Sequence, residues 1–250
     1  MIFYFSATGN SKHVAEVVGQ ALNEEICDLL AFESDSYTLS EYECLGIVSP
    51  TYSWELPSVT REFLKRVRFE RTTDNYIFGI TTYGTTPGAS GAEIEHWLKL
   101  TGMKIDALFG VQMPDTWTVI FDLSDSDKVE RQNARAEEQL GVVAFALKKR
   151  TLGNYVHRRM PYFVRNISDH FYEGMRQTKK LHVEDSCIGC GLCAKKCPVQ
   201  AIEMRDGQPV WVKEQCAMCL GCLHRCPKFA IQYQDKTQEH GQYKNPHTKI

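Results

Sequence analysis

Cysteine spacing constrains this chain more than any other feature. Eight of its ten cysteines form two copies of the pattern Cys-x2-Cys-x2-Cys-x3-Cys-Pro. They are Cys187, Cys190, Cys193 and Cys197 in the first copy, and Cys216, Cys219, Cys222 and Cys226 in the second. This spacing is typical of [4Fe–4S] clusters, because three thiolates two residues apart can wrap one corner of a cluster while the fourth points to a neighbouring one. The chain is therefore predicted to hold two [4Fe–4S] clusters and to move electrons one at a time.

Each triplet is expected to take its fourth ligand from the opposite copy. We define the first cluster site as Cys187, Cys190, Cys193 and Cys226, and the second cluster site as Cys216, Cys219, Cys222 and Cys197. An offset of 29 residues, the distance from Cys187 to Cys216, also superposes Ala201 on Ala230 and Ile202 on Ile231. Such self-similarity indicates a duplicated unit. Residues 181–235 thus resemble the bacterial two-cluster ferredoxins, a small α+β domain, with short strands or turns expected at 199–204 and 228–233.

Two other uses of cysteine compete with this interpretation. Structural zinc takes four cysteines per ion, and disulfides require an oxidising compartment. Neither explains a third cysteine two residues on together with a Cys-Pro step, both of them repeated. The remaining Cys27 and Cys44 lie in apolar, strand-like segments and are expected to be small core residues. The eight histidines show no spacing typical of a metal site.

Composition points to a cytoplasmic protein without a membrane or nucleic-acid partner. The chain begins with the apolar run Met1 to Phe5, which predicts a buried strand and leaves no room for a signal peptide. No stretch has the length of a transmembrane helix. Lysine and arginine number 29 against 31 acidic residues, so no excess of positive charge suggests nucleic-acid binding. Oxygen-sensitive clusters fit the reducing cytoplasm of an anaerobic or microaerobic cell.

The first 150 residues alternate strand-like and helix-like patterns, which is typical of an α/β domain with a parallel sheet. Strands are expected near 1–5, 24–30, 44–50, 75–83 and 106–113. Helices are expected near 10–22, 57–68, 90–101 and 125–150. Five strands at this spacing predict a doubly wound, parallel five-stranded sheet.

A short polar loop follows the first predicted strand and opens the first helix. Its sequence, from Ser6 to Lys12, is SATGNSK. Unpaired helix N–H groups, hydroxyls and the close backbone approach that Gly9 permits suit a phosphate. The plainer alternative is that Ser11 or Thr8 only caps the helix.

Two further loops are expected at the same edge of the sheet, where doubly wound folds bind ligands. They follow the third and fourth predicted strands at 49–57 and 82–89 and contain aromatic side chains, backbone amides and glycine. A flat heterocycle could lie between them. No dinucleotide fingerprint and no nucleotide P-loop occurs in the chain, which argues against direct reduction by a nicotinamide cofactor.

The chain as a whole resembles the prokaryotic flavodoxin–ferredoxin fusion proteins, also called EFR-type ferredoxins. The resemblance rests on the Ser6–Lys12 loop, Pro50 and Tyr52, the strand end at 113–115 and the eight cysteines. It implies a flavodoxin-like domain that binds FMN noncovalently. The phosphate would lie on Ser6, Thr8, Gly9, Asn10 and Ser11, and the ring between Thr51, Tyr52, Ser53 and Trp54 on one side and Tyr83, Gly84 and Thr85 on the other. Tyr52, Trp54, Tyr83 and Trp117 are all candidates to stack on the ring, with Tyr52 and Trp54 favoured.

Four segments follow from these patterns. They are a flavodoxin-like domain at 1–150, a helical basic linker at 151–180, a ferredoxin domain at 181–235 and a polar tail at 236–250. The linker carries Arg158, Arg159 and Arg165 among several aromatic residues. That composition allows RNA binding, but a helix that packs on both domains with solvated charges fits better. The tail is poor in core formers, so it is expected to be either tethered or loose.

The expected function is electron transfer between the two clusters and FMN, linking a low-potential donor to a partner protein or a small acceptor. Clusters pass single electrons, whereas a flavin accepts one or two. Two alternatives stay open. The flavin site could reduce a substrate of its own, which would make the chain a flavin-dependent reductase without assigned catalytic residues, or the clusters could act as a redox sensor.

Overall fold

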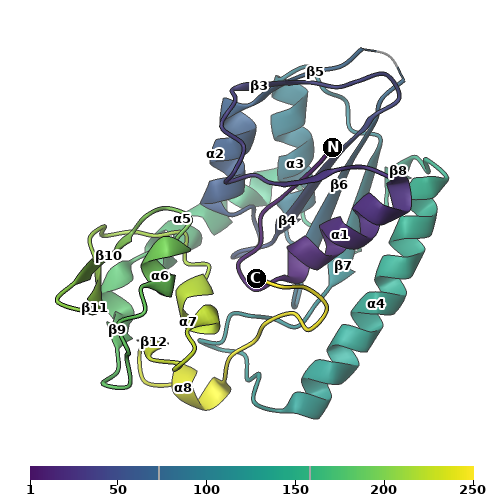
Figure 1. Ribbon diagram of the computed structural model, residues 1–250. Coiled ribbons are helices and arrows are strands. Elements are labelled where there is room, and N and C mark those ends of the chain that lie inside the picture. The colour runs from purple at the N-terminus through teal and green to yellow at the C-terminus, as the bar shows by residue number, and fades with distance from the viewer. Residues whose placement is uncertain (73, 158) are drawn as a thin grey trace.

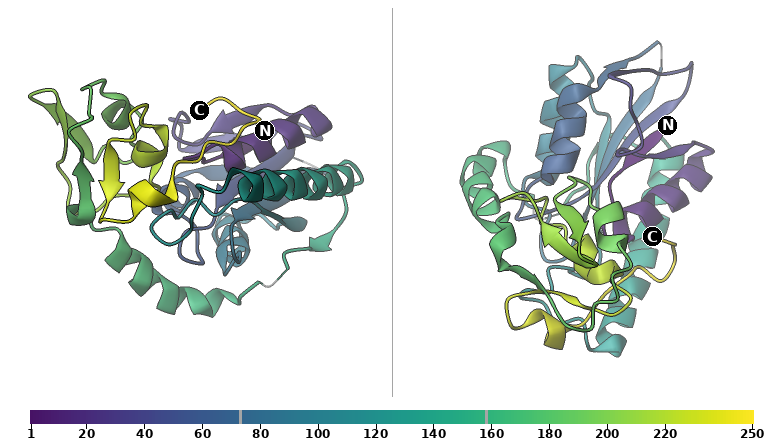
Figure 2. Two further views of the ribbon diagram at one scale, coloured as in Figure 1. Left: turned by 90° about the horizontal axis from the view of Figure 1, so that it is seen from below. Right: turned by 60° about the vertical axis from the view of Figure 1, so that its left-hand side comes forward.

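The computed structural model describes residues 1–72, 74–157 and 159–250, without the side chains of 164–168. Arg158, which the sequence placed in the basic linker, lies outside the described residues. The chain forms a large α/β part and a smaller part built around the cysteine motifs, and the connecting segment runs around the outside between them (Figures 1 and 2).

A parallel sheet forms the centre of the large part. Its strand order is β2-β1-β4-β6-β7-β8, and every neighbouring pair is parallel. The strands are β1 (Ile2–Tyr4), β2 (Ile26–Asp28), β4 (Cys44–Pro50), β6 (Tyr76–Tyr83), β7 (Ala107–Gln112) and β8 (Gly153–Asn154). Five of the six match the predicted strands. The predicted count was wrong by one, because β8 is only two residues long and too short to leave a pattern in the sequence.

Helices cover both faces of this sheet, as the doubly wound fold requires. The four helices are α1 (Asn10–Leu22), α2 (Ser58–Arg66), α3 (Ser90–Leu100) and α4 (Ser126–Lys148), close to the predicted ranges. One core lies between the sheet and α1 with α4, and a second core lies between the sheet and α2 with α3. Two short strands, β3 (Ser36–Thr38) and β5 (Arg68–Glu70), pair beside the sheet. Among the described residues, every helix is too short or too polar to span a lipid bilayer.

The smaller part consists of two antiparallel strand pairs and short helices. Strand β9 (Leu181–Val183) pairs with β12 (Ile231–Tyr233), and β10 (Ile202–Arg205) pairs with β11 (Gln208–Trp211). The helices are α6 (Leu192–Lys195), α7 (Gly221–Arg225) and α8 (Thr237–His240). Strands β10 and β12 overlap the two predicted ranges, but both begin three residues later than expected, after the turn at each Cys-Pro step, and β10 ends one residue beyond its range.

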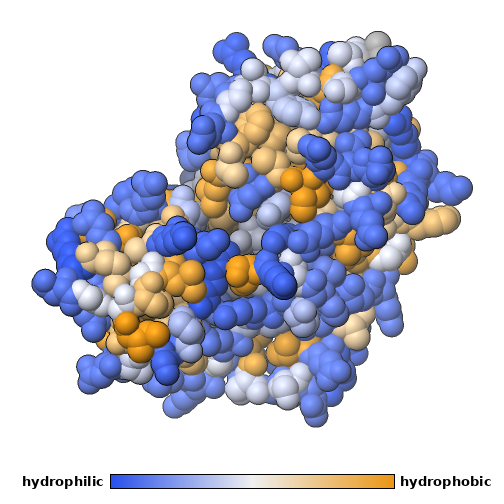
Figure 3. Space-filling view, viewed as in Figure 1, coloured by the Kyte–Doolittle hydropathy of each residue, from blue (hydrophilic) through white to orange (hydrophobic). Residues whose placement is uncertain are grey.

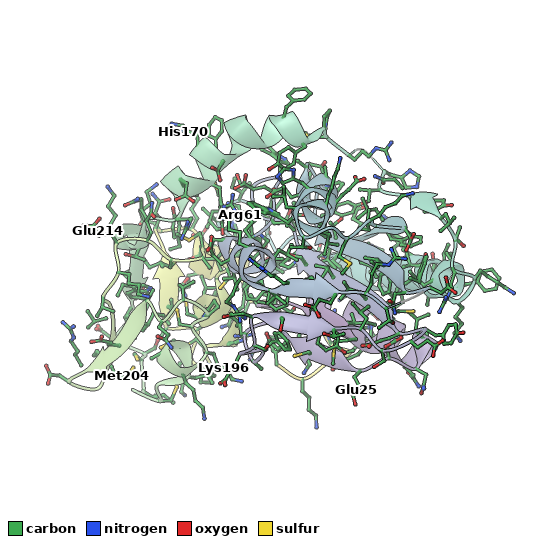
Figure 4. The ribbon with its side chains drawn as sticks, turned by 90° about the horizontal axis from the view of Figure 1, so that it is seen from above. Glu25, Arg61, His170, Lys196, Met204 and Glu214 are labelled. Atoms are coloured by element: carbon green, nitrogen blue, oxygen red, sulfur yellow. The ribbon has the colours of Figure 1, made fainter. Side chains whose placement is uncertain are left out.

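The connecting segment contains helix α5 (Arg165–Met175), flanked by the 3-10 turns η1 (Tyr162–Val164) and η2 (Thr178–Lys180). Tyr172 on α5 is buried between the two parts. Its hydroxyl donates to the Ala217 carbonyl at 2.8 Å and accepts from the Ser58 N–H at 3.3 Å. Arg61 on α2 donates to Asp169 on α5 at 2.6 Å, and Figure 4 shows Arg61 beside α5. The helix therefore attaches the smaller part to the sheet.

The C-terminal residues are not loose. They run from the smaller part back to the start of helix α1 (Figures 1 and 2). Tyr243 and Asn245 are 4% and 3% exposed. The face seen in Figure 3 is largely hydrophilic, with small apolar patches scattered over both parts.

Candidate functional site

A cavity of about 350 Å³ opens at the carboxyl ends of the parallel strands. It is lined by the loops after β1, β4, β6 and β7, by two residues of helix α5 and by three residues of the second cysteine motif. Of the twelve predicted flavin-binding residues, all but Gly9 line it: Ser6, Thr8, Asn10, Ser11, Thr51, Tyr52, Ser53, Trp54, Tyr83, Gly84 and Thr85. The parallel topology brings these loops together, because the strand ends meet at one edge of the sheet.

The loop from Ser6 to Lys12, here called the phosphate loop, leaves the first turn of α1 without a side-chain cap. The Ser6 hydroxyl accepts from the Gly9 N–H at 3.1 Å, and the Ser11 hydroxyl lies 2.8 Å from that of Thr82. The N-cap residue is Gly9, so neither Ser11 nor Thr8 is the cap that the plainer alternative named. The first N–H groups of a helix have no partner within it and attract an anion, so this uncapped terminus fits a phosphate.

Gly9 adopts a left-handed backbone conformation with φ of +100°. A side chain at this position would lie 2.9 Å from Cβ of Asn245 and about as close to Thr248 and Ile250. The sequence explained Gly9 by close approach to a phosphate. In the structure the missing side chain makes room for the C-terminal residues.

The β4–α2 loop carries a tight turn at the rim of the cavity. Ser53 and Trp54 have φ of +50° and +68°, and the Tyr52 N–H donates to the Glu55 carbonyl at 2.9 Å. Such backbone conformations cost energy for residues other than glycine and are found at functional sites. The turn leaves Trp54 44% exposed, while the Tyr52 ring packs edge-on against Phe5.

The loop after β7 contributes Asp115, which the sequence noted only as part of a strand end. Its carboxylate accepts from the Trp117 N–H at 3.1 Å and from the Thr85 hydroxyl at 3.0 Å. Burial raises the pKa of Asp115. A side chain on Gly84 would clash with Asp115 at 2.2 Å, so glycine allows these two loops to meet. The same loop brings Trp117, Ile120 and Phe121 to the cavity.

Two smaller cavities lie within the cysteine motifs, and each contains four cysteines. One is lined by all members of the first cluster site, Cys187, Cys190, Cys193 and Cys226. The other is lined by all members of the second cluster site, Cys197, Cys216, Cys219 and Cys222. Each cavity thus combines a triplet from one copy with the last cysteine of the other copy.

Backbone N–H groups point at several of these sulfurs. The Ala201 N–H donates to Cys197 Sγ at 3.2 Å, and the equivalent Ala230 N–H donates to Cys226 Sγ at 3.3 Å. Burial raises the pKa of the Cys216 thiol to about 12 and also raises that of Cys222. Thiols in such surroundings ionise only beside a compensating positive charge, which iron would supply. In the described part of the chain, no three His, Cys, Asp or Glu residues are grouped closely enough to hold a single metal ion.

Met218, Cys219 and Leu220 line both the large cavity and the cavity of the second cluster site. Met218 and Leu220 have φ of +48° and +50°, so the strip is tightly curved. The second cluster site therefore adjoins the large cavity. Among the described residues, those that line the first cluster site line neither of the other two cavities. Sequence spacing predicts Cys219 as a ligand, but it carries no signal that this cysteine faces a second cavity.

Comparison with known proteins supports these assignments at the level of domains. The model for a flavodoxin domain matches residues 1–139, and the model for a 4Fe-4S dicluster domain matches residues 179–227. Together they support a role in electron transfer and imply FMN and [4Fe–4S] clusters as cofactors.

No curated protein matches the chain. Among solved structures, rubredoxin oxygen:oxidoreductase from the anaerobe Desulfovibrio gigas is similar to it, with 16% identity and a TM-score of 0.34. That match covers 60% of this chain and 36% of the solved protein, so the chain spans little more than a third of its length. The flavodoxin-domain match extends over more than half of the sequence, and the chain therefore belongs to the flavodoxin family, with an iron–sulfur domain fused behind it.

Proposed function

We propose that the chain passes single electrons between two [4Fe–4S] clusters and a noncovalently bound FMN. The observation that carries this proposal is the strip Met218–Leu220, which is a wall of both the large cavity and the second cluster site. A cluster in one cavity and a flavin in the other would be separated by little more than one layer of side chains. Bound FMN supplies the ability to exchange one or two electrons, while each cluster exchanges one.

The residues of the chain would hold the cofactors in three ways. The phosphate loop offers the uncapped N–H groups of α1 to the phosphate. The loops at 50–54, 82–86 and 113–117 surround the space for the ring. The eight cysteines supply one quartet to each smaller cavity. The two parts of the fold keep water from the strip between FMN and the second cluster, since Met218 and Leu220 are buried.

The test is anaerobic purification with iron, sulfide and flavin counted in the same sample, followed by titration with dithionite. We expect about eight irons and one FMN per chain, because each four-cysteine quartet holds one four-iron cluster. Stepwise bleaching of cluster and flavin bands should follow, and rapid mixing should show electrons reaching FMN through the clusters. A protein that binds zinc alone, or no flavin, would contradict the proposal.

A second candidate function is a flavin-dependent reductase that acts on its own small substrate. The cavity favours it in one respect, because Ile120 and Trp54 at its edge are 66% and 44% exposed. A small molecule could therefore reach the ring. Steady turnover of a small acceptor by the isolated, chemically reduced protein would support the reductase, whereas transfer only to a partner protein would support the carrier.

A further inference from the structure

The C-terminal residues Gln242–Ile250, which we name the tail clamp, pack against the phosphate loop on the side away from the large cavity. The large cavity is lined by phosphate-loop residues but by none from the tail clamp. Tyr243 and Asn245 are nevertheless buried. Buried polar side chains normally have hydrogen-bond partners, so the partners of Tyr243 and Asn245 show what the tail clamp holds.

Asn10 of the phosphate loop is the centre of these contacts. Its Oδ1 lies 2.9 Å from the Tyr243 hydroxyl and accepts from Asn245 Nδ2 at 3.1 Å. Its Nδ2 donates to the Pro114 carbonyl at 3.4 Å. The Asn245 N–H also donates to the Thr8 carbonyl at 2.8 Å. The Asn10 amide is thus held from both sides, and the backbone of the loop is held beside it.

The contacts continue along the loop and into α1. Asn245 fills the space beside Gly9. Lys12 Nζ donates to the Lys249 carbonyl at 2.5 Å. The rings of His13 and His247 stack with their centres 5.1 Å apart. The tail clamp therefore touches the segment whose free N–H groups are offered to a phosphate.

At its other end the tail clamp is fixed to helix α7. This helix contains Cys222 of the second cluster site and is followed directly by Cys226 of the first. Gln242 Nε2 donates to the carbonyls of Leu223 and Cys226 at 2.6 and 2.8 Å. The Tyr243 N–H donates to His224 Nδ1 at 3.1 Å. Helix α7 also reaches the loop directly, since Arg225 donates to the Ser6 carbonyl at 3.0 Å. The iron–sulfur part thus contacts the phosphate loop directly at Ser6 and, through the tail clamp, at Asn10 and Lys12.

We propose that the tail clamp is a positioning element of the flavin site. It holds the phosphate loop in the conformation that binds a phosphate, and it couples FMN affinity to the iron–sulfur part of the chain. The physical reason is preorganisation, because a loop already fixed in its bound shape loses less entropy on binding. By linkage the coupling is reciprocal, so bound FMN should also hold the tail clamp in place. The proposal rests on the FMN site of the proposed function.

The test compares three variants of the full-length, cluster-loaded protein after removal of its flavin. Asn245→Ala removes a side chain that contacts Gly9 and Asn10, and Tyr243→Phe removes only the hydroxyl. Lys244→Ala is the control, because Lys244 is exposed between them. FMN affinity is measured anaerobically by quenching of flavin fluorescence. We expect roughly threefold to tenfold weaker binding for Asn245→Ala, a smaller loss for Tyr243→Phe and no change for Lys244→Ala.

Riboflavin, which lacks the phosphate, distinguishes this positioning role from general damage. The Asn245→Ala and Tyr243→Phe variants should bind riboflavin as the parent does, because the phosphate loop then has no anion to hold. Hydrogen exchange of residues 242–250 should slow when FMN is added to the parent protein. Iron counts before titration verify that the clusters are intact; if Asn245→Ala loses iron, Tyr243→Phe alone decides, since it keeps the packed ring.

Two results would overturn the proposal: equal FMN affinity in all variants, or an equal loss of riboflavin and FMN affinity. A parent protein that binds no FMN would instead refute the proposed function on which the tail clamp rests.

Discussion

The two copies of the cysteine motif share their ligand spacing but differ in what surrounds them. Ile188, which follows the first cysteine of the first copy, is 60% exposed. Its equivalent in the second copy, Ala217, is 1% exposed and belongs to the core between the sheet and helices α2 and α3. Cys190 is exposed, whereas the equivalent Cys219 is half-buried at the large cavity. The first copy thus faces solvent, and the second faces the flavodoxin domain.

The contrast continues at the helices that end each triplet. Lys195 and Lys196 of the first copy are exposed. His224, the equivalent of Lys195, is fully buried. Its Nε2–H donates to the Thr116 carbonyl at 2.9 Å, and its Nδ1 accepts from the Tyr243 N–H of the tail clamp. Burial lowers the pKa of His224 to about 4, so the ring is neutral near pH 7. Ligand spacing determines whether a cluster is bound, and the residues between the ligands determine whether that cluster lies near solvent or near the flavodoxin domain.

The largest expected difference between the copies comes from exchanging their last ligands. Cys197→Ala should remove the cluster of the second site and stop reduction of FMN through the clusters, while the first cluster survives. Cys226→Ala should remove the cluster of the first site instead. Counting iron and recording electron paramagnetic resonance spectra of the reduced proteins would check this. Equal loss of both clusters in each variant would contradict the assigned quartets.

A smaller effect is expected for the buried histidine. His224→Ala should lower the free energy of unfolding by about 2–4 kcal/mol, because it removes two hydrogen bonds and leaves a space at the contact between domains. Lys195→Ala is the matched control and should change it by less than about 0.5 kcal/mol. Denaturant unfolding of equally loaded proteins measures both values. Similar losses in the two variants would mean that the copies are equally buried.

The residue after the first cysteine of each copy gives the next comparison. Ala217→Ile should lower the free energy of unfolding by about 1–3 kcal/mol, because Ala217 is buried in a packed core and larger side chains in such cores cause strain. Ile188→Ala should alter it by no more than about 0.5 kcal/mol. Thermal unfolding under anaerobic conditions would record the difference. A neutral Ala217→Ile variant would show that the second copy packs loosely.

The smallest effect concerns charge. Arg225 is half-buried beside Ser6 and the second cluster site, and its Nε is buried with no partner among the described residues. Reduction adds an electron to a cluster, so a nearby cation stabilises the reduced form. Arg225→Gln should lower the potential of the second cluster by roughly 40–90 mV, which corresponds to about 1–2 kcal/mol of charge interaction.

An exposed lysine of the first copy provides the control for that measurement. Lys195 lines neither cluster cavity, and solvent and salt screen its charge, so Lys195→Gln should shift either potential by much less. Redox titrations followed by electron paramagnetic resonance give both potentials. Equal shifts in the two variants would show that Arg225 does not stabilise the reduced second cluster more than an exposed lysine does.

Much of the fold was predictable because its patterns are local. Helix α1 begins and ends at the residues expected from the sequence, since its apolar face and the polar loop before it are contiguous. The two-residue strand β8 was missed because its pairing with β7 depends on distant residues. The same holds for Tyr243, whose polar neighbours suggest solvent. Its burial depends on Asn10 and Asn133, which are more than 100 residues away in the chain.

The candidate site shows the same division. The cysteines and the loops at the strand ends were visible as motifs, because each chemistry requires residue types at fixed spacing. The wall formed by Met218–Leu220 and the contribution of helix α5 were not visible. Both arise from how the two domains meet, and no short stretch of sequence encodes that contact.

The first cluster site and the large cavity are each lined by exposed residues, and these residues differ. A protein that contacts the exposed Ile188 and Cys190 reaches the first cluster site, whereas one that contacts Trp54 and Ile120 reaches the large cavity. Because these contacts share no residue, a donor and an acceptor need not take turns on one surface. Electron delivery and withdrawal could then proceed within a single ternary complex.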